Sequence, residues 1–379
     1  MSTFAFGTYR ITDQNPLHIE ALKEAIEGSI ELIDTAADYT DGGAERAIGY
    51  VLDRTPDSIR NRVKIISKCG YTDTKESLTE QLDKSLKRLN QTKIDCYLFQ
   101  NPEYFLYDAI KKEMPKDAML DAMYEQIFNM FSALEEEVKN GKIDSYGISS
   151  ENFSKKSDAL DFLPYEDLIQ LAQKAAYKLG HTTHSFSTIE LPINILEQDG
   201  LKCAKWAKDN GLRVLATRPL NAHYNNLMFR LADYENSKEY DYYLNELLEV
   251  SDDELLKPLY NIIEQMDMNK HKFGWVGEYD TFLITQIMPH IQKALQNIDK
   301  NALEDLLRYI ELFLVEYRKT VAYECSLRLR TELKDIFKKC DKQIQECALE
   351  FLLEQKDIDY IVVGMKKPTY VQEILTLKS

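Results

Sequence analysis

Short runs of β-branched and aromatic residues alternate along the chain with longer stretches whose apolar side chains recur every three or four positions. The first pattern is typical of strands and the second of amphipathic helices. The runs that predict strands are 4–11, 30–34, 63–67, 94–99, 145–149, 185–191, 213–217 and 359–364. Helical stretches lie between them, so strand and helix alternate over most of the chain.

This alternation predicts parallel strands joined by helical crossovers. A doubly wound sheet would share it, but the G-x-G-x-x-G turn of such folds does not follow the first run. We therefore expect an α/β fold, namely a (β/α)8 TIM barrel. In such a barrel the active site lies at the carboxyl ends of the strands.

The alternation stops at 222–341, where the pattern becomes helical and rich in tyrosine. A compact barrel unit needs far fewer residues between its seventh strand and the following barrel helix. We expect the barrel in 1–221 and 342–379, with 222–341 as a helical insertion at the active-site face. One long apolar stripe within it is formed by Leu303, Leu307, Ile310, Leu314, Tyr317 and Val321. The insertion would wall the substrate pocket or pair two chains.

Composition narrows the class of protein. Hydrophobic residues make up 44% of the 379 positions, and the formal net charge of -16 argues against nucleic-acid binding. No apolar run reaches the roughly 18 residues of a membrane span, and the first residues do not resemble a secretory signal. We expect free cysteines and a reduced, cytoplasmic protein. For His181 and His184 we favour a structural role over a metal site.

The strand ends carry candidate chemistry in the stretch IELIDTAADYTDGGAERAIGYVL, which precedes KIISKCG. A carbonyl that accepts hydride needs a proton at its oxygen, and the phenol of Tyr39 can supply one. The ammonium of Lys68 would lower the pKa of that phenol. A carboxylate at Asp34 would hold the lysine in place and keep it charged.

The combination D-T-A-x-x-Y, G-G-A-E and the later lysine resembles the active-site core of the aldo-keto reductases. The resemblance covers 4 to about 220 and about 344–375. It implies an NAD(P)(H)-dependent oxidoreductase acting on a small carbonyl, alcohol or sugar-like substrate, with NADP(H) favoured over NAD(H). From the net charge and the lack of a long apolar run, we expect no nucleic-acid or membrane partner. The resemblance places cofactor contacts at Gly7, Thr8, Ser149, Ser150, Asn152, Glu190, Arg218, Gly364, Lys366 and Lys367.

The chain departs from the family pattern at several contact positions. Gln100 stands where a histidine usually orients the carbonyl, and Thr217 where an aromatic ring usually stacks on the nicotinamide. Glu190 replaces a glutamine, and Tyr370 an arginine that often recognises the 2′-phosphate. These departures leave two alternatives: a barrel that senses cofactor or binds a partner, and a non-redox enzyme that uses the Tyr39 and Lys68 pair for proton transfer.

Overall fold

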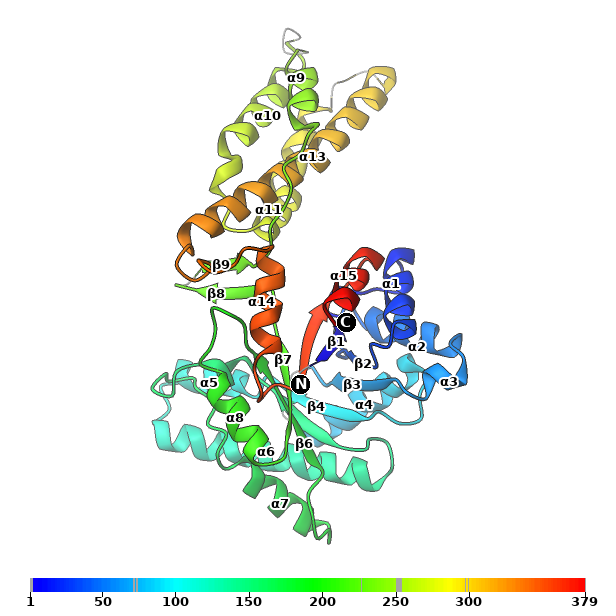
Figure 1. Cartoon of the computed structure of the whole chain (residues 1–379), viewed down its shortest axis with the longest axis vertical. Helices are drawn as coiled ribbons and strands as arrows, with labels where there is room; N and C mark the ends of the chain where they lie inside the picture. Colours follow the sequence, from blue (N-terminus) through cyan, green and yellow to red (C-terminus); the bar gives the residue numbers. More distant parts are fainter. Residues whose placement is uncertain are drawn as a thin grey trace. The chain divides into compact units, whose positions relative to one another are not determined.

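The computed structural model describes residues 3–70, 72, 74–225, 227–249, 254–296, 298 and 300–378. The chain forms two compact units (Figure 1). The barrel unit runs to Pro219 and resumes at Leu349, and the second unit spans Leu220–Ala348.

Parallel strands close the barrel, which confirms the predicted fold class. Its strands are β1 (Thr3–Gly7), β2 (Leu32–Asp34), β3 (Lys64–Lys68), β4 (Cys96–Gln100), β5 (Tyr146–Ser149), β6 (Phe186–Pro192), β7 (Arg213–Thr217) and β10 (Tyr360–Gly364). The order around the barrel is β1-β10-β7-β6-β5-β4-β3-β2. All eight predicted runs are strands, although β1 is shorter than its run of 4–11. It ends at Thr8, whose backbone amide and hydroxyl both donate hydrogen bonds to the carbonyl of Asp34.

Helices connect successive strands on the outside of the barrel (Figure 1). They are α1 (Pro16–Glu27), α2 (Gly43–Asp53), α3 (Asp57–Arg60), α4 (Lys75–Leu89), α5 (Glu103–Lys111), α6 (Lys116–Lys139), the 3-10 helix η1 (Glu151–Ser154), α7 (Leu168–Lys178), α8 (Leu201–Asp209), α14 (Ile344–Leu353) and α15 (Pro368–Lys378). Local sequence sets their ends. Asn15 accepts a hydrogen bond from the amide of Leu17 and Pro16 opens α1, while Asn90 ends α4 in the left-handed region.

Every second residue of a strand points into the barrel. A buried interior cluster contains Ala5, Leu32, Ile66, Cys96, Leu98, Leu215 and Val362. The next inward-pointing residues, two positions further along these strands, are Gly7, Asp34, Lys68, Gln100, Thr217 and Gly364. Ser149 lies in register with Gln100, and Glu190 in register with Ser149. The polar residues singled out from the sequence therefore form the last interior layer at the carboxyl ends.

The second unit has its own core. It contains the hairpin β8 (Asn221–Tyr224) and β9 (Leu227–Arg230), followed by α9 (Tyr240–Glu249), α10 (Lys257–Asn269), the 3-10 helix η3 (Lys270–Lys272), α11 (Val276–Phe282), the π-helix η4 (Leu283–Ile287), α12 (Met288–Ala294) and α13 (Lys300–Glu332). The sequence did not predict the hairpin. Tyr279 and Phe313 pack on Tyr317 of α13, with ring centroids 5.2 Å and 5.6 Å apart. These rings therefore pack helices within the unit itself.

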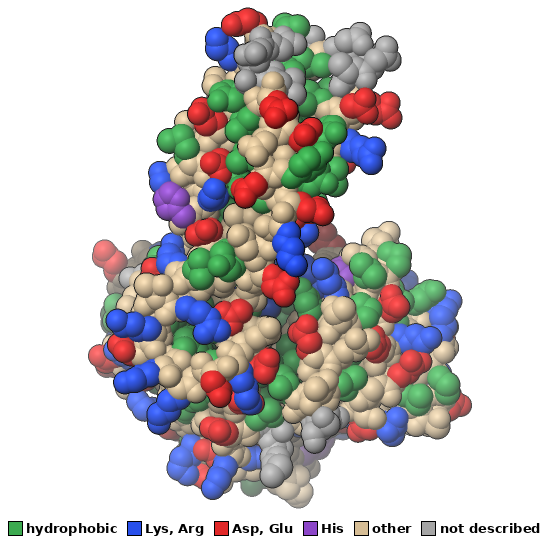
Figure 2. Space-filling model, turned by 45° about the horizontal axis from the view of Figure 1, so that its top comes forward, with side chains coloured by type: hydrophobic (Ala, Val, Ile, Leu, Met, Phe, Trp, Pro, Cys, Tyr) green, Lys and Arg blue, Asp and Glu red, His purple; other side chains and the backbone are tan. Residues whose placement is uncertain are grey.

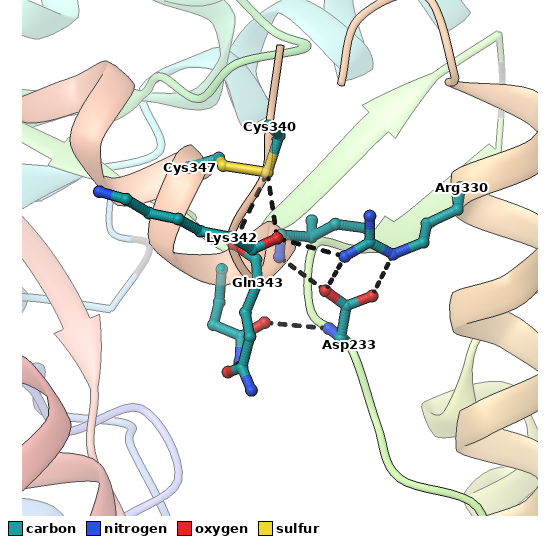
Figure 3. The surroundings of a disulfide bond; sticks show 8 residues. Asp233, Arg330, Cys340, Lys342, Gln343 and Cys347 are labelled. Carbon is teal, nitrogen blue, oxygen red and sulfur yellow. Dashed lines mark hydrogen bonds and ion pairs between the residues drawn. A yellow bond between two sulfur atoms is a disulfide. The ribbon is translucent and has the colours of Figure 1, made fainter. Parts of the chain in front are cut away.

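A disulfide joins Cys340 to Cys347 at the start of α14 (Figure 3). The expectation that all cysteines are free is wrong for this pair. Beside it, Asp233 binds the guanidinium of Arg330 and accepts a hydrogen bond of 2.7 Å from the amide of Ile344. Asp233 thus ties the end of α13 to the start of α14. The remaining cysteines are free, and Cys69, Cys96 and Cys203 are buried.

On the face shown in Figure 2, acidic and basic side chains are interspersed over the molecule. Among the described residues, none of the helices combines the length and apolarity that a bilayer crossing needs. The boundaries predicted for the insertion, its place at the active-site face and the cytoplasmic location stay predictions.

Candidate active site

A buried lysine between two carboxylates forms the centre of the last interior layer. The ammonium of Lys68, at the end of β3, contacts Asp34 Oδ1 at the end of β2 and donates to the carbonyl of Thr35 at 3.0 Å. Glu190 Oε1, from β6, lies 3.4 Å from the same nitrogen. Lys68 is fully buried, and Asp34 and Glu190 are each 3% exposed. The ion pair of Asp34 and Lys68 therefore forms as the sequence suggested, but with a second carboxylate.

Tyr39 lies in the loop after β2, above this lysine. The ammonium of Lys68 is 5.4 Å from the centroid of its ring. Tyr9 packs edge-on against the same ring at 5.1 Å. Two features fix the conformation of this loop. Thr40 and Asp41 have φ values of 50° and 53°. The Thr40 hydroxyl donates a hydrogen bond of 2.6 Å to the carbonyl of Ile11. A residue other than glycine in the left-handed backbone region costs energy, and such residues often mark functional sites.

Burial dominates the electrostatics of the cluster. It raises the pKa of Asp34 well above its ordinary value, and the neighbouring Glu190 carboxylate adds to that shift. Burial opposes the charge of Lys68, yet Asp34 and Glu190 outweigh it and raise the lysine pKa. Burial also raises the pKa of Tyr39, although Lys68 opposes the change. The expectation of a lowered phenol pKa is therefore wrong, and Tyr39 stays protonated at neutral pH.

Glu190 makes contacts that the sequence did not predict. Its Oε1 accepts a hydrogen bond of 2.8 Å from the Ser149 hydroxyl, in addition to its ion pair with Lys68. Its Oε2 is buried and has no hydrogen-bond partner within the described chain. A buried carboxylate oxygen without a partner is costly in a finished structure, so it marks a place for a ligand donor.

Gln100 closes β4 in the same layer. Its Oε1 is likewise buried without a hydrogen-bond partner among the described residues. The next residue, Asn101, has a φ of 52° and donates from its amide to the carbonyl of Ser149 at 2.9 Å. The side-chain amide of Gln100 is thus held at the carboxyl end of the strand with bonding capacity left over for a ligand.

Ser150 and Asn152 are engaged within the protein. The hydroxyl of Ser150 donates to the buried carboxyl of Glu103 at 2.8 Å. The amide of Asn152 donates to the carbonyl of Asp161 at 2.6 Å and accepts from the Tyr107 hydroxyl at 3.1 Å. These two predicted cofactor contacts therefore shape the loop after β5, and binding a carboxamide would require them to exchange partners.

The predicted phosphate segment lies at the end of β10 and in the loop after it, and two further predicted cofactor contacts lie at the ends of β1 and β7. A Cβ added to Gly364 would meet open space, and Lys366 and Lys367 precede α15. Gly7 is in register with Gly364 on the adjacent strand β1. Arg218 follows β7 with a φ of 53° and binds Glu197 at 2.8 Å, while its Nε is buried without a hydrogen-bond partner among the described residues.

A cleft of about 530 Å³ opens beside the phenol. It is lined by Tyr9, Arg10, Asp38, Tyr39 and Thr40. Apart from Tyr39, these residues were not singled out from the sequence, because they lie in loops whose pattern carries no periodic signal. Within the described ranges, no group of three or more His, Cys, Asp or Glu side chains is placed to hold a metal ion. Of the two histidines considered from the sequence, His181 has a structural partner, because its Nδ1 lies 3.3 Å from the carboxylate of Glu135.

Comparison with known proteins gives one extensive match. The model of the aldo/keto reductase family matches residues 3–378. Methylglyoxal reductase YeaE of Escherichia coli K12 is 27% identical over 208 residues, which are 55% of this chain and 59% of that protein. The chain thus matches about three-fifths of the length of this curated relative.

Solved structures show weaker likeness. An aldo/keto reductase from Klebsiella pneumoniae in complex with NADP and acetate is 22% identical, with a TM-score of 0.41, over 57% of this chain and 64% of its own. Aldo-keto reductase AKR11C1 from Bacillus halodurans, in its holo form, is 15% identical with a TM-score of 0.49, over 99% of this chain and 86% of its own.

Proposed function

Because this chain belongs to the aldo/keto reductase family, we propose that it is an NAD(P)(H)-dependent oxidoreductase acting on a small carbonyl or alcohol. The observation that carries the proposal is the position of the Tyr39 phenol beside the buried pair of Lys68 and Asp34 at the carboxyl ends of the strands. A bound nicotinamide supplies or accepts the hydride.

Tyr39 is the proposed proton donor. As hydride reaches a carbonyl carbon, negative charge develops on the oxygen, and a phenol at that oxygen can pass its proton across. Burial keeps the Tyr39 phenol in its protonated form. Lys68 stabilises the phenolate that remains, because its ammonium lies next to the ring. Asp34 holds that ammonium in place.

Gln100 is the proposed orienting residue. An amide can donate one hydrogen bond to the carbonyl oxygen, but it cannot titrate as the usual histidine can. The neighbouring cleft, lined by Tyr9 and Arg10, is the proposed entrance for substrate. Because the relative from Escherichia coli is a methylglyoxal reductase, methylglyoxal belongs among the first substrates to test.

The residues present fit a nicotinamide dinucleotide, with NADP(H) favoured. The unpartnered Oε2 of Glu190 can accept from the amide N–H of a carboxamide. At the other end, the open space at Gly364 leaves room for a phosphate beside Lys366 and Lys367. Two lysines supply charge for a 2′-phosphate, although without the bidentate geometry of an arginine. Gly7, Thr8 and Arg218 complete the proposed cofactor contacts.

Titration with NADPH, followed by turnover on a carbonyl panel, tests the proposal. We expect the cofactor fluorescence to change on binding and the bound cofactor to be oxidised when a reactive aldehyde is added. Binding without turnover on the whole panel would point to a cofactor-sensing barrel instead. Failure to bind either NADPH or NADH would contradict the proposal. It would leave two alternatives, namely proton transfer by Tyr39 and Lys68, and a barrel that binds another ligand or partner.

A further inference from the structure

Two carboxylates share one ammonium in the active-site layer, and this imbalance has a consequence for the cofactor. Asp34 and Glu190 both contact Lys68, and all three side chains are buried. One positive charge offsets one carboxylate. The second is left over, either as a negative charge or as a proton held by the pair. A glutamine at position 190 would leave neither a surplus negative charge nor a shared proton.

Glu190 also presents that surplus to a ligand. Ser149 and Lys68 bind Oε1, which fixes the carboxyl group from one side. Oε2 has no hydrogen-bond partner among the described residues, although it is buried. Besides Glu190, three charged or titratable groups act on the phenol of Tyr39. They are Lys68 and Asp34 of the cluster and the exposed Asp38. The Asp34 and Glu190 side chains also lie within hydrogen-bonding reach of each other, which raises the pKa of Asp34. The Oε2 of Glu190 is the oxygen in this cluster that is buried and available to a ligand.

We propose that Glu190 is a specificity-determining residue that makes this site prefer the oxidised nicotinamide cofactor over the reduced one. The inference rests on the proposed function, because it requires the nicotinamide to lie against Glu190. The oxidised ring carries a positive charge and the reduced ring is neutral. A carboxylate in contact with the carboxamide attracts the former and not the latter. If the pair holds a proton, the cationic ring displaces it, so the direction of the preference is the same.

The expected effect is large enough to measure. One unit charge about 6–8 Å from the ring, at an effective dielectric constant near 20, corresponds to roughly 30–100-fold in affinity. Proton uptake by the pair reduces this figure, so we expect about ten-fold at pH 8. Tighter binding of the oxidised form stabilises the state that holds oxidised cofactor and alcohol. The preference would therefore shift the equilibrium on the enzyme towards carbonyl reduction, in contrast to a site with glutamine at this position.

The test is the ratio of the dissociation constants of NADPH and NADP⁺, measured by calorimetry on the full chain at pH 8. The native protein should bind NADP⁺ at least as tightly as NADPH. Glu190→Gln should lower the ratio about ten-fold, because it keeps the shape of the side chain and removes its charge. Glu190→Asp, which keeps the charge, should stay within about three-fold of the native ratio.

Asp41→Asn is the matched control, since it removes an exposed carboxylate of the same loop that does not line the cleft. It should leave the ratio unchanged. An equal ratio in the native protein and Glu190→Gln would overturn the inference while leaving the proposed function intact, and so would an equal fall in Asp41→Asn. A native protein that prefers NADPH contradicts it without any variant, even if Glu190→Gln fails to fold. Binding of neither form would overturn the proposed function together with the inference.

Discussion

Replacing Lys68 by methionine should destabilise the barrel, and the loss should grow as pH rises. The variant removes the only ammonium that the described structure places against the buried carboxyls of Asp34 and Glu190. Removing one partner of a buried ion pair typically costs about 3–5 kcal/mol. Two carboxylates that contact the same nitrogen lie within about 6 Å of each other, where two unit charges repel by about 3 kcal/mol at an effective dielectric constant of 20.

The pH dependence follows from the direction of the shifts. Asp34 already has a raised pKa in the folded protein, so the folded state holds its proton more tightly than the unfolded chain. Such a group contributes stability below its unfolded pKa, and that contribution is lost as pH rises through the folded pKa. Without Lys68 the shift is larger. Lys68→Met should therefore be closest to the native stability near pH 5 and furthest from it near pH 8.

Guanidinium unfolding measures this directly. The chain has two tryptophans, Trp206 in α8 of the barrel unit and Trp275 in the second unit. A Trp275→Phe background makes fluorescence report on the barrel alone, which matters because two units need not unfold together. Adding Glu190→Gln to Lys68→Met should recover part of the loss at pH 8. An equal difference in stability between Lys68→Met and the native protein at pH 5 and pH 8 would refute the reasoning.

Other consequences are open to single experiments. Gln100→Ala should lower native turnover by about 10²–10³-fold, since one oriented donor near developing charge contributes about 2.7–4 kcal/mol. Gln100→His should instead raise the single-turnover rate toward simple aldehydes. A Gln100→His variant that binds cofactor but stays inactive would show that the loss of activity has another cause. Lys366→Ala combined with Lys367→Ala should weaken NADPH more than NADH, and equal weakening in a binding titration would count against a 2′-phosphate contact there. Replacing Cys340 and Cys347 by serine should lower the free energy of unfolding of the second unit by about 2–3 kcal/mol, because the bond closes a short loop in the unfolded chain; an unchanged Trp275 unfolding curve would argue against the bond in solution.

The sequence predicted the barrel because its signal is local. Each strand is a short apolar run, and period-two alternation then carries Asp34, Lys68 and Gln100 to one layer without further information. The contact between Glu190 and Lys68 joins β6 to β3, and neither strand's pattern reveals which side chains meet across the barrel. The pairing of Cys340 with Cys347 likewise depends on how the chain turns between them.

The electrostatics were the least predictable part. The type and spacing of Tyr39 and Lys68 suggested a lowered phenol pKa, since a cation stabilises a phenolate. Burial acts in the opposite direction and outweighs it, and the extra carboxylate of Glu190 adds to the rise. Neither the depth of burial nor the second carboxylate can be read from the residues around position 39 alone. For the reduction reaction the phenol carries its proton at working pH, but a raised pKa also makes it a weaker acid. The charge of Lys68 beside the ring therefore has to stabilise the phenolate as the proton leaves.

Single-turnover oxidation of bound NADPH by Tyr39→Phe tests the central claim most directly. The variant keeps the ring that packs against Tyr9 and removes only the hydroxyl, so cofactor affinity should stay close to native. The rate of cofactor oxidation with a reactive aldehyde should fall by about 10²–10⁴-fold, the usual contribution of a general acid. Normal oxidation of the bound cofactor by Tyr39→Phe would contradict the assignment of Tyr39 as the proton donor.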